Sequence, residues 1–379
     1  MLKVPFLERS SQKGSGLKEP FYDPTKSYDE NYDQGPFGSF ADGKIFEQTG
    51  EPEYDFLGQK VYLPFGIPAG PLLNSKFCKG AFEKGFDICV YKTVRSGIFP
   101  CHPFPNVLAV KVEGDLTMEK AQKPIVADNN YSEPISITNS FGVPSKETKI
   151  WQEDVKKAIS CAGKGQVLVL SFMGTVKEGQ TPEEFVADYA LAAKQSVETG
   201  AKVLETNLSC PNIGNEGLVC YNLEMTERVC KAIRAEIGDT PLILKVGYYK
   251  NDEDIKKLVE IAGKYAQAIS SINTIQVEVR DKEGNQALPG KNRLRSGVCG
   301  ASIKWAGLEM VRRLRKVTGY RLQGTVKIIG VGGVTKANDY FEYIEAGADA
   351  VMSATGAMWN PQLAQEISRA WRFALKSKI

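Results

Sequence analysis

From residue 60 onward, short apolar runs alternate with amphipathic stretches of helical period, and the alternation occurs eight times. This pattern is typical of repeated βα units, so it restricts the chain to an α/β fold. The expected strands lie at 61–68, 88–92, 167–171, 203–207, 242–246, 268–272, 326–330 and 350–353. One helix start is sharply marked at 181–184, where Pro182 follows a capping Thr181 and Glu184 completes a capping box.

Two architectures can hold such units, and the position of the glycines distinguishes them. A doubly wound sheet normally places a glycine-rich phosphate turn in its first unit. Here the double glycine Gly332-Gly333 follows the seventh expected strand, where many barrels bind phosphate. We therefore predict a (β/α)8 TIM barrel over 56–379, with an insertion at the catalytic mouth over 93–146 and an extra strand at 135–138.

Residues 1–55 are rich in Gly, Ser, Asp, Tyr and Pro and show neither helical nor strand periodicity. They are predicted to form an irregular N-terminal arm. Its scattered aromatic residues favour packing against the body or a second subunit over free disorder. We expect the arm to carry none of the chemistry. The aromatic residues are Phe21, Tyr28, Phe37 and Phe40.

The charge balance argues for a small-molecule partner. Lys and Arg total 48 against 45 acidic residues, a net charge of +3, which gives no strong field for nucleic acid or anionic lipid. The eight cysteines show no CxxC spacing, and no apolar stretch suits a signal peptide or a membrane span. We expect a cytoplasmic protein without a metal site, in which His102 and most cysteines are incidental.

The segment Asn-Leu-Ser-Cys-Pro-Asn, residues 207–212, directly follows the fourth expected strand. In a barrel, polar residues just beyond the carboxyl end of a strand face the active site. A cysteine there, flanked by two carboxamides, can act as a general acid or base beside a planar heterocycle. The alternative is a buried structural cysteine next to a Pro-Asn turn, and the strand-end position favours chemistry.

Two lysines end expected strands, Lys92 the second and Lys245 the fifth. A lysine that terminates a buried strand needs an anion or a polar cavity, because burying an unpaired ammonium costs several kcal/mol. Either one alone could be a surface lysine at a strand end. Together they indicate an anionic ligand.

The 207–212 segment resembles the catalytic segment of class 1 dihydroorotate dehydrogenases and the pyrimidine-reducing domain of dihydropyrimidine dehydrogenases, and the resemblance extends over 60–375. It implies oxidation of dihydroorotate to orotate in pyrimidine biosynthesis, with Cys210 as general base, hydride transfer to FMN, and a homodimer. The implied substrate residues are Lys92, Asn139, Phe141, Gly142, Val143, Asn207, Asn212, Asn273 and Thr274. The implied FMN residues are Ala69, Gly70, Lys92, Thr93, Asn139, Lys245, Gly297, Gly300, Gly332, Gly333, Ala354 and Thr355. Gly297–Gly300 is expected to be a glycine-rich turn before a helix at Ser302.

The chain also departs from the family pattern. After Lys92 the family usually carries Gly-Asn-Pro and Arg, whereas residues 95–106 of this chain read RSGIFPCHPFPN. Asn273-Thr274 is closer to the class 2 and dihydropyrimidine enzymes than to the Asn-Ser of the soluble fumarate-linked class. Reduction of uracil or thymine therefore stays an alternative. A tRNA dihydrouridine synthase is a more distant one, because the chain lacks a basic surplus and a helical domain beyond the barrel. The electron acceptor is open.

Overall fold

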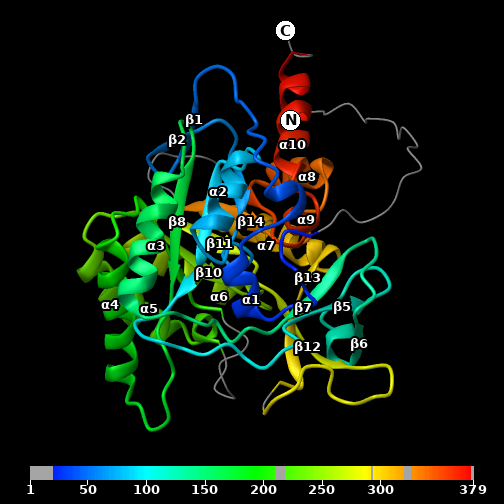
Figure 1. The fold of residues 1–379 in the computed structure, drawn as a ribbon. Coiled ribbons are helices and arrows are strands. Elements are labelled where there is room, and N and C mark those ends of the chain that lie inside the picture. Colours follow the sequence, from blue (N-terminus) through cyan, green and yellow to red (C-terminus); the bar gives the residue numbers. More distant parts are fainter. Residues whose placement is uncertain (1–19, 210–217, 292, 320–325, 377–379) are drawn as a thin grey trace.

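The computed structural model describes residues 20–209, 218–291, 293–319 and 326–376. Eight parallel strands close into a barrel (Figure 1). Each barrel strand pairs with the next barrel strand in chain order, and the last pairs with the first. The predicted TIM barrel is therefore confirmed. Its strands are β3 (Phe65–Ile67), β4 (Ile88–Val94), β8 (Val167–Phe172), β9 (Val203–Asn207), β10 (Leu242–Val246), β11 (Ala268–Ser271), β14 (Lys327–Val331) and β15 (Ala350–Met352).

Helices follow the barrel strands and pack outside them (Figure 1). Helix α4 starts as predicted, because the Thr181 side chain accepts from the backbone N–H of Glu184 and the Glu184 side chain reaches back to Thr181. No helix in the described ranges is long and apolar enough to cross a membrane. The helices outside the arm are α2 (Ser75–Glu83), α3 (Thr148–Ser160), α4 (Pro182–Val197), α5 (Leu223–Ile237), α6 (Asp252–Tyr265), α7 (Lys304–Thr318), α8 (Ala337–Ala346), α9 (Thr355–Trp359) and α10 (Leu363–Lys376).

The barrel interior is apolar toward the amino ends of the strands and polar toward their carboxyl ends. Successive side chains on a strand point to opposite faces, so every second residue enters the interior. The apolar cluster inside the barrel contains Ile88, Val90, Val167, Val169, Val203, Ile243, Ala268, Ile329, Val331, Ala350 and Met352. Continuing the same alternation brings buried polar residues to the carboxyl end: Lys92, Ser171, Glu205, Asn207, Lys245 and Ser270.

A hairpin formed by β1 (Tyr54–Phe56) and β2 (Gln59–Val61) closes the amino end of the barrel, where Phe56 and Val61 join the apolar interior cluster. The first barrel strand was predicted to begin at Val61. It begins instead at Phe65, because Val61 pairs with Tyr54 in the hairpin and Pro64 has no N–H for a ladder. The domain boundary placed at residue 55 falls within this hairpin and stays a prediction.

A second sheet stands beside the barrel and draws on two insertions (Figure 1). The insertion after β4 supplies β5 (Val107–Lys111), β6 (Ile125–Asp128) and β7 (Ser136–Asn139), the last being the predicted extra strand. The stretch after β11 supplies β12 (Ile275–Arg280) and β13 (Arg295–Gly300). The predicted turn at Gly297–Gly300 was wrong: these residues pair with β7 and form part of a strand. Apolar and polar residues alternate in Ile275–Arg280, and the apolar ones are buried. This alternation is a strand signal that the sequence analysis missed.

The described part of the arm packs against the barrel. Phe21, Tyr28 and Phe40 are buried, and Phe37 is half-buried. The arm also contains a short helix, α1 (Tyr28–Gln34), that was not predicted from the sequence although Ser27 and Glu30 form a capping box at its start. The expectation that the arm packs rather than remains free is confirmed for these residues.

Phe21 should contribute strongly to stability. Its ring is fully buried, 4.3 Å between centroids from Phe40 and 6.0 Å from Phe77. Phe21→Ala should lower the free energy of unfolding by about 3 to 5 kcal/mol, the usual cost of truncating a buried phenylalanine. Denaturant titration measures the change, with Phe37→Ala as the matched control for a half-buried ring of the same segment. Equal losses for the two variants would contradict the assigned packing.

Candidate active site

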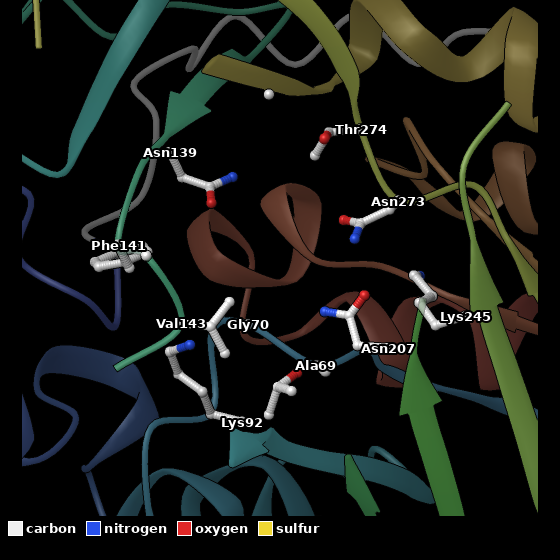
Figure 2. Close-up of a pocket in the computed structure, with 13 residues that line it drawn as sticks. Ala69, Gly70, Lys92, Asn139, Phe141, Val143, Asn207, Lys245, Asn273 and Thr274 are labelled. Carbon is white, nitrogen blue, oxygen red and sulfur yellow. The ribbon is translucent and has the colours of Figure 1, made fainter. Parts of the chain in front are cut away.

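A cavity of about 580 Å³ opens at the carboxyl rim of the barrel. Figure 2 shows the side chains of Asn139, Asn207 and Asn273 pointing into it, with Lys92 on one side and Lys245 on the other. Every residue of its lining belongs to the set that the sequence singled out. The lining consists of Ala69, Gly70, Lys92, Thr93, Asn139, Phe141, Gly142, Val143, Asn207, Lys245, Asn273, Thr274 and Gly297.

A second cavity, of about 700 Å³, adjoins the first and shares part of its lining, including Asn139, Lys245 and Asn273. Its wall is mainly apolar and includes Pro68, Leu73, Val107, Ile137, Val331 and Met358. Ala354 and Thr355, expected from the sequence to hold a phosphate, line this second cavity. The two cavities therefore form adjoining parts of one site, and the second part has the more apolar lining.

The two lysines predicted to meet an anion are both buried at this rim. Burial lowers the pKa of Lys245 to about 8, although the negative charge of Glu205 opposes the shift. The Lys245 Nζ lies 3.5 Å from the Ser270 hydroxyl. The Lys92 Nζ lies 5.8 Å from the centre of the Phe141 ring, within the range of a cation–π contact. The site therefore has two buried cationic side chains in its lining.

Asn207 and Asn273 hold the backbone of one residue between them. The Asn207 Oδ1 accepts from the Ser209 N–H at 3.0 Å, and the Asn273 Nδ2 donates to the Ser209 carbonyl. The chain just after β9 is thereby fixed against the end of β11. Cys210 and Asn212, predicted from the sequence as base and substrate ligand, lie outside the described residues.

The loop at 141–143 presents three backbone N–H groups that make no hydrogen bond with any described residue. Its carbonyl groups are all engaged: the buried Arg95 donates to the carbonyls of Gly142 and Val143, and the His102 N–H donates to that of Phe141. Val143 has a φ of +54°, an unusual conformation for a β-branched residue. Successive free N–H groups of this kind form a concave site for an anion.

Three of the predicted cofactor residues are not brought into either cavity. Gly300 packs β13 against Ile135 and Ser136, and Gly332 and Gly333 lie in the turn after β14. Thr93 does line the first cavity, and its hydroxyl lies 3.0 Å from that of Ser171. The roles assigned to all these residues from the resemblance remain predictions.

The sequence analysis gave no role to most of the apolar wall of the second cavity, nor to four further residues in or beside the two cavities. Arg95 anchors the loop at 141–143, and Tyr22 of the arm lines the second cavity. Cys299 lines the same cavity, with its sulfur 3.3 Å from the Thr355 hydroxyl. His102, expected to be incidental, is half-buried with its Nδ1 3.3 Å from the Ser140 hydroxyl. Only Arg95 had a readable signal, because a cation three residues beyond a strand-end lysine stays close to the rim.

These features define a class of protein: a TIM-barrel enzyme with a candidate active site at the carboxyl rim, where two buried lysines and three asparagines line a cavity. The chain belongs to the dihydroorotate dehydrogenase family, whose model, described as dihydroorotate dehydrogenase, matches residues 109–372. It is an oxidoreductase of the kind that acts on a CH–CH bond, and flavin dependence is general in this family.

Individual relatives agree with this assignment. The chain is 34% identical over 362 residues to the dihydroorotate dehydrogenase of Dictyostelium discoideum, which covers 92% of this chain and 97% of the relative. It is 28% identical over 236 residues to the catalytic subunit of dihydroorotate dehydrogenase B (NAD(+)) of Brachyspira hyodysenteriae, over 62% of this chain and 71% of the relative. The corresponding subunit of Trichlorobacter lovleyi is 33% identical over 192 residues, 50% of this chain and 59% of the relative.

A side chain at Gly142 should strain the backbone of the 141–143 loop and destabilise the protein. Its φ is +76°, and an added Cβ would lie 2.5 Å from the His102 Nε2. Gly142→Ala should lower the free energy of unfolding by about 1 to 2 kcal/mol, the cost of a left-handed conformation for a residue with a Cβ. Gly97→Ala, in the same insertion, is the control, because nothing lies within 4 Å of its added Cβ. A parental stability for Gly142→Ala would show that the loop adjusts freely.

Proposed function

We propose that this protein oxidises dihydroorotate to orotate, with FMN in the two adjoining cavities as the immediate acceptor. The observation that carries the proposal is the trio of N–H groups at Phe141, Gly142 and Val143, which make no hydrogen bond with any described residue and line the same cavity as the buried Lys92. A carboxylate needs several convergent donors, and the ring carboxylate distinguishes dihydroorotate from uracil or thymine derivatives. The family of the chain and its relatives named dihydroorotate dehydrogenase support the same substrate.

The residues of the cavity fit FMN. The apolar wall of the second cavity suits a planar ring, and the Thr274 hydroxyl is buried there without a hydrogen-bond partner among the described residues. Lys245 places a buried cation where the reduced ring would carry negative charge, and Ala354 and Thr355 would hold the phosphate end. When bound, FMN supplies a two-electron acceptor for the hydride that leaves C6 of the substrate.

The protein's own part in the reaction is to orient the ring and remove one proton. We assign the proton at C5 to Cys210, whose thiolate would accept it as a general base. This assignment draws on the anchoring of Ser209, the neighbour of Cys210 in the chain, by Asn207 and Asn273. The two asparagines retain carboxamide edges toward the cavity, where they would pair with the pyrimidine ring.

The proposal extends to a cytoplasmic homodimer of class 1 type. The electron acceptor that reoxidises the flavin is left open, although the B-type relatives carry NAD(+) in their names. Light scattering of the purified protein measures the assembly directly.

Substrate identity can be read from the flavin itself. Anaerobic titration of the FMN-loaded protein with dihydroorotate should bleach the flavin absorbance, because two electrons pass to the ring. Dihydrouracil and dihydrothymine should bleach it far more slowly at equal concentration, since they bring no carboxylate to the loop at 141–143. Preferential bleaching by either of these two would instead favour a dihydropyrimidine enzyme. Protein that neither retains nor rebinds FMN would contradict the proposal as a whole.

Cys210→Ser should slow reduction of the flavin by dihydroorotate about 10² to 10⁴-fold, the usual loss on removing a general base. Binding of FMN and of orotate should change little, because the side chains are nearly equal in size. The parental rate should rise with pH as the thiol ionises, and the variant should lose that dependence. Stopped-flow reduction measures both effects, with Cys161→Ser as the control, since Cys161 lies at the end of α3 away from the site. A parental rate and pH profile in Cys210→Ser would leave Cys210 a structural residue.

A further inference from the structure

A carboxyl group lies inside the barrel, next to the candidate site but outside its lining. Glu205 belongs to β9, is 0% exposed, and stands in register between Ser171 of β8 and Ile243 of β10. Ile243 and Val203, the preceding inward residue on β9, belong to the apolar cluster inside the barrel. Glu205 therefore sits at the level where the interior changes from apolar to polar.

No described residue makes a hydrogen bond of ordinary geometry with either carboxylate oxygen of Glu205. Burial raises the pKa of Glu205, while the charge of Lys245 and the nearby Ser171 hydroxyl oppose that shift. A buried carboxyl without donors costs several kcal/mol relative to an apolar side chain of the same size. Packing alone does not account for an acidic residue at this position.

Lys245 is the charged group that Glu205 faces. The strand register places Lys245 beside Asn207 on β9 and Ser270 on β11, one inward step further along the barrel than Glu205. The two side chains make no direct hydrogen bond, yet their charges interact within the buried interior of the barrel. In such surroundings a Coulomb interaction acts over several ångströms with little screening. Burial lowers the pKa of Lys245, and the charge of Glu205 partly offsets this by raising it.

The other groups around Lys245 cannot replace this role. Ser171, Asn207 and Ser270, which border the pair from β8, β9 and β11, do not titrate in the relevant range. Lys92, from β4, is the further charged residue in the lining of the first cavity, and its positive charge disfavours a second cation. Among the described residues that surround Lys245, Glu205 is the acidic one.

We propose that Glu205 is a positioning residue that keeps Lys245 protonated while the flavin is oxidised, so that a full positive charge is in place before the ring becomes negative. This inference rests on the proposed function, because it requires FMN beside Lys245. A charge that is already present stabilises the developing anion without waiting for a proton from solvent. Without Glu205, Lys245 would lose its proton at lower pH and stabilise the reduced ring only after taking up a proton.

Sulfite tests this inference without turnover. It adds to oxidised flavin and leaves a negative charge on the ring, so its affinity reports a cation beside the ring. The dissociation constant is measured by absorbance for FMN-loaded parent and Glu205→Gln at several pH values. Glu205→Gln should bind sulfite about tenfold more weakly than the parent at pH 8.5, the effect of a shift of about one pH unit in the charge of Lys245. At pH 6, where Lys245 is charged in both proteins, the variant should bind sulfite at least as tightly as the parent.

Two further variants complete the design. Glu205→Asp keeps the negative charge and should retain the parental pH profile, whereas Glu205→Met removes it and suits an apolar interior, so it should repeat the result of Glu205→Gln if that variant does not fold. Asp87→Asn is the matched control, because Asp87 is equally buried but precedes β4 at the opposite end of the barrel, where it accepts from the Leu63 N–H at 2.7 Å. It should leave the sulfite profile unchanged.

A parental sulfite profile in both charge-removing variants would overturn the inference, as would a uniform weakening at every pH, which indicates structural damage. Failure of the parent to bind FMN would instead refute the proposed function. The two failures are thereby distinguishable.

Discussion

The closure of eight parallel strands imposes the main constraint on this molecule. Because every strand runs in the same direction, all eight carboxyl ends meet at one rim, and the backbone pairs in the barrel leave no free edge. The apolar residues of the interior lie toward the amino ends of the strands, so side chains that enter the barrel at the carboxyl rim face the cavity instead. Lys92, Asn207 and Lys245 come from three strands far apart in the sequence, and the closed barrel brings them to one cavity. The chemistry of the site depends on this closure.

Much of the barrel and of its rim was predictable from the sequence. Strands buried on both faces have continuous apolar sequences. A lysine or asparagine at the end of such a strand needs polar surroundings, which the rim of the barrel provides. This reasoning alone predicts that Lys92, Asn207 and Lys245 lie at the rim, where they line the first cavity. The segment at 138–144 and the asparagine after β11 give only weak signals by themselves, so their assignment drew mainly on the family resemblance.

Other features depend on tertiary contacts that no local pattern specifies. The second sheet forms because β13 pairs with β7, which lies far earlier in the chain, and the apparent glycine-rich turn at Gly297–Gly300 becomes a strand through that pairing. Tyr22 reaches the second cavity only because the arm packs against the body. The sequence analysis gave Glu205 no role, although a carboxylate within a strand that is buried throughout is a signal that could have been recognised.

The pairing of β7 with β13 also links the site to the order in which the chain folds. The two strands carry Asn139 and Gly297, both in the lining of the first cavity, and the chain between them contains four of the barrel strands, β8 to β11. Closing so long a segment while it is unstructured costs conformational entropy, so the pairing becomes favourable only when the intervening strands have already assembled. We therefore expect the site to be completed late in folding. A ligand that bridges the two strands binds only the assembled barrel, and its binding free energy accordingly stabilises strands that it does not touch.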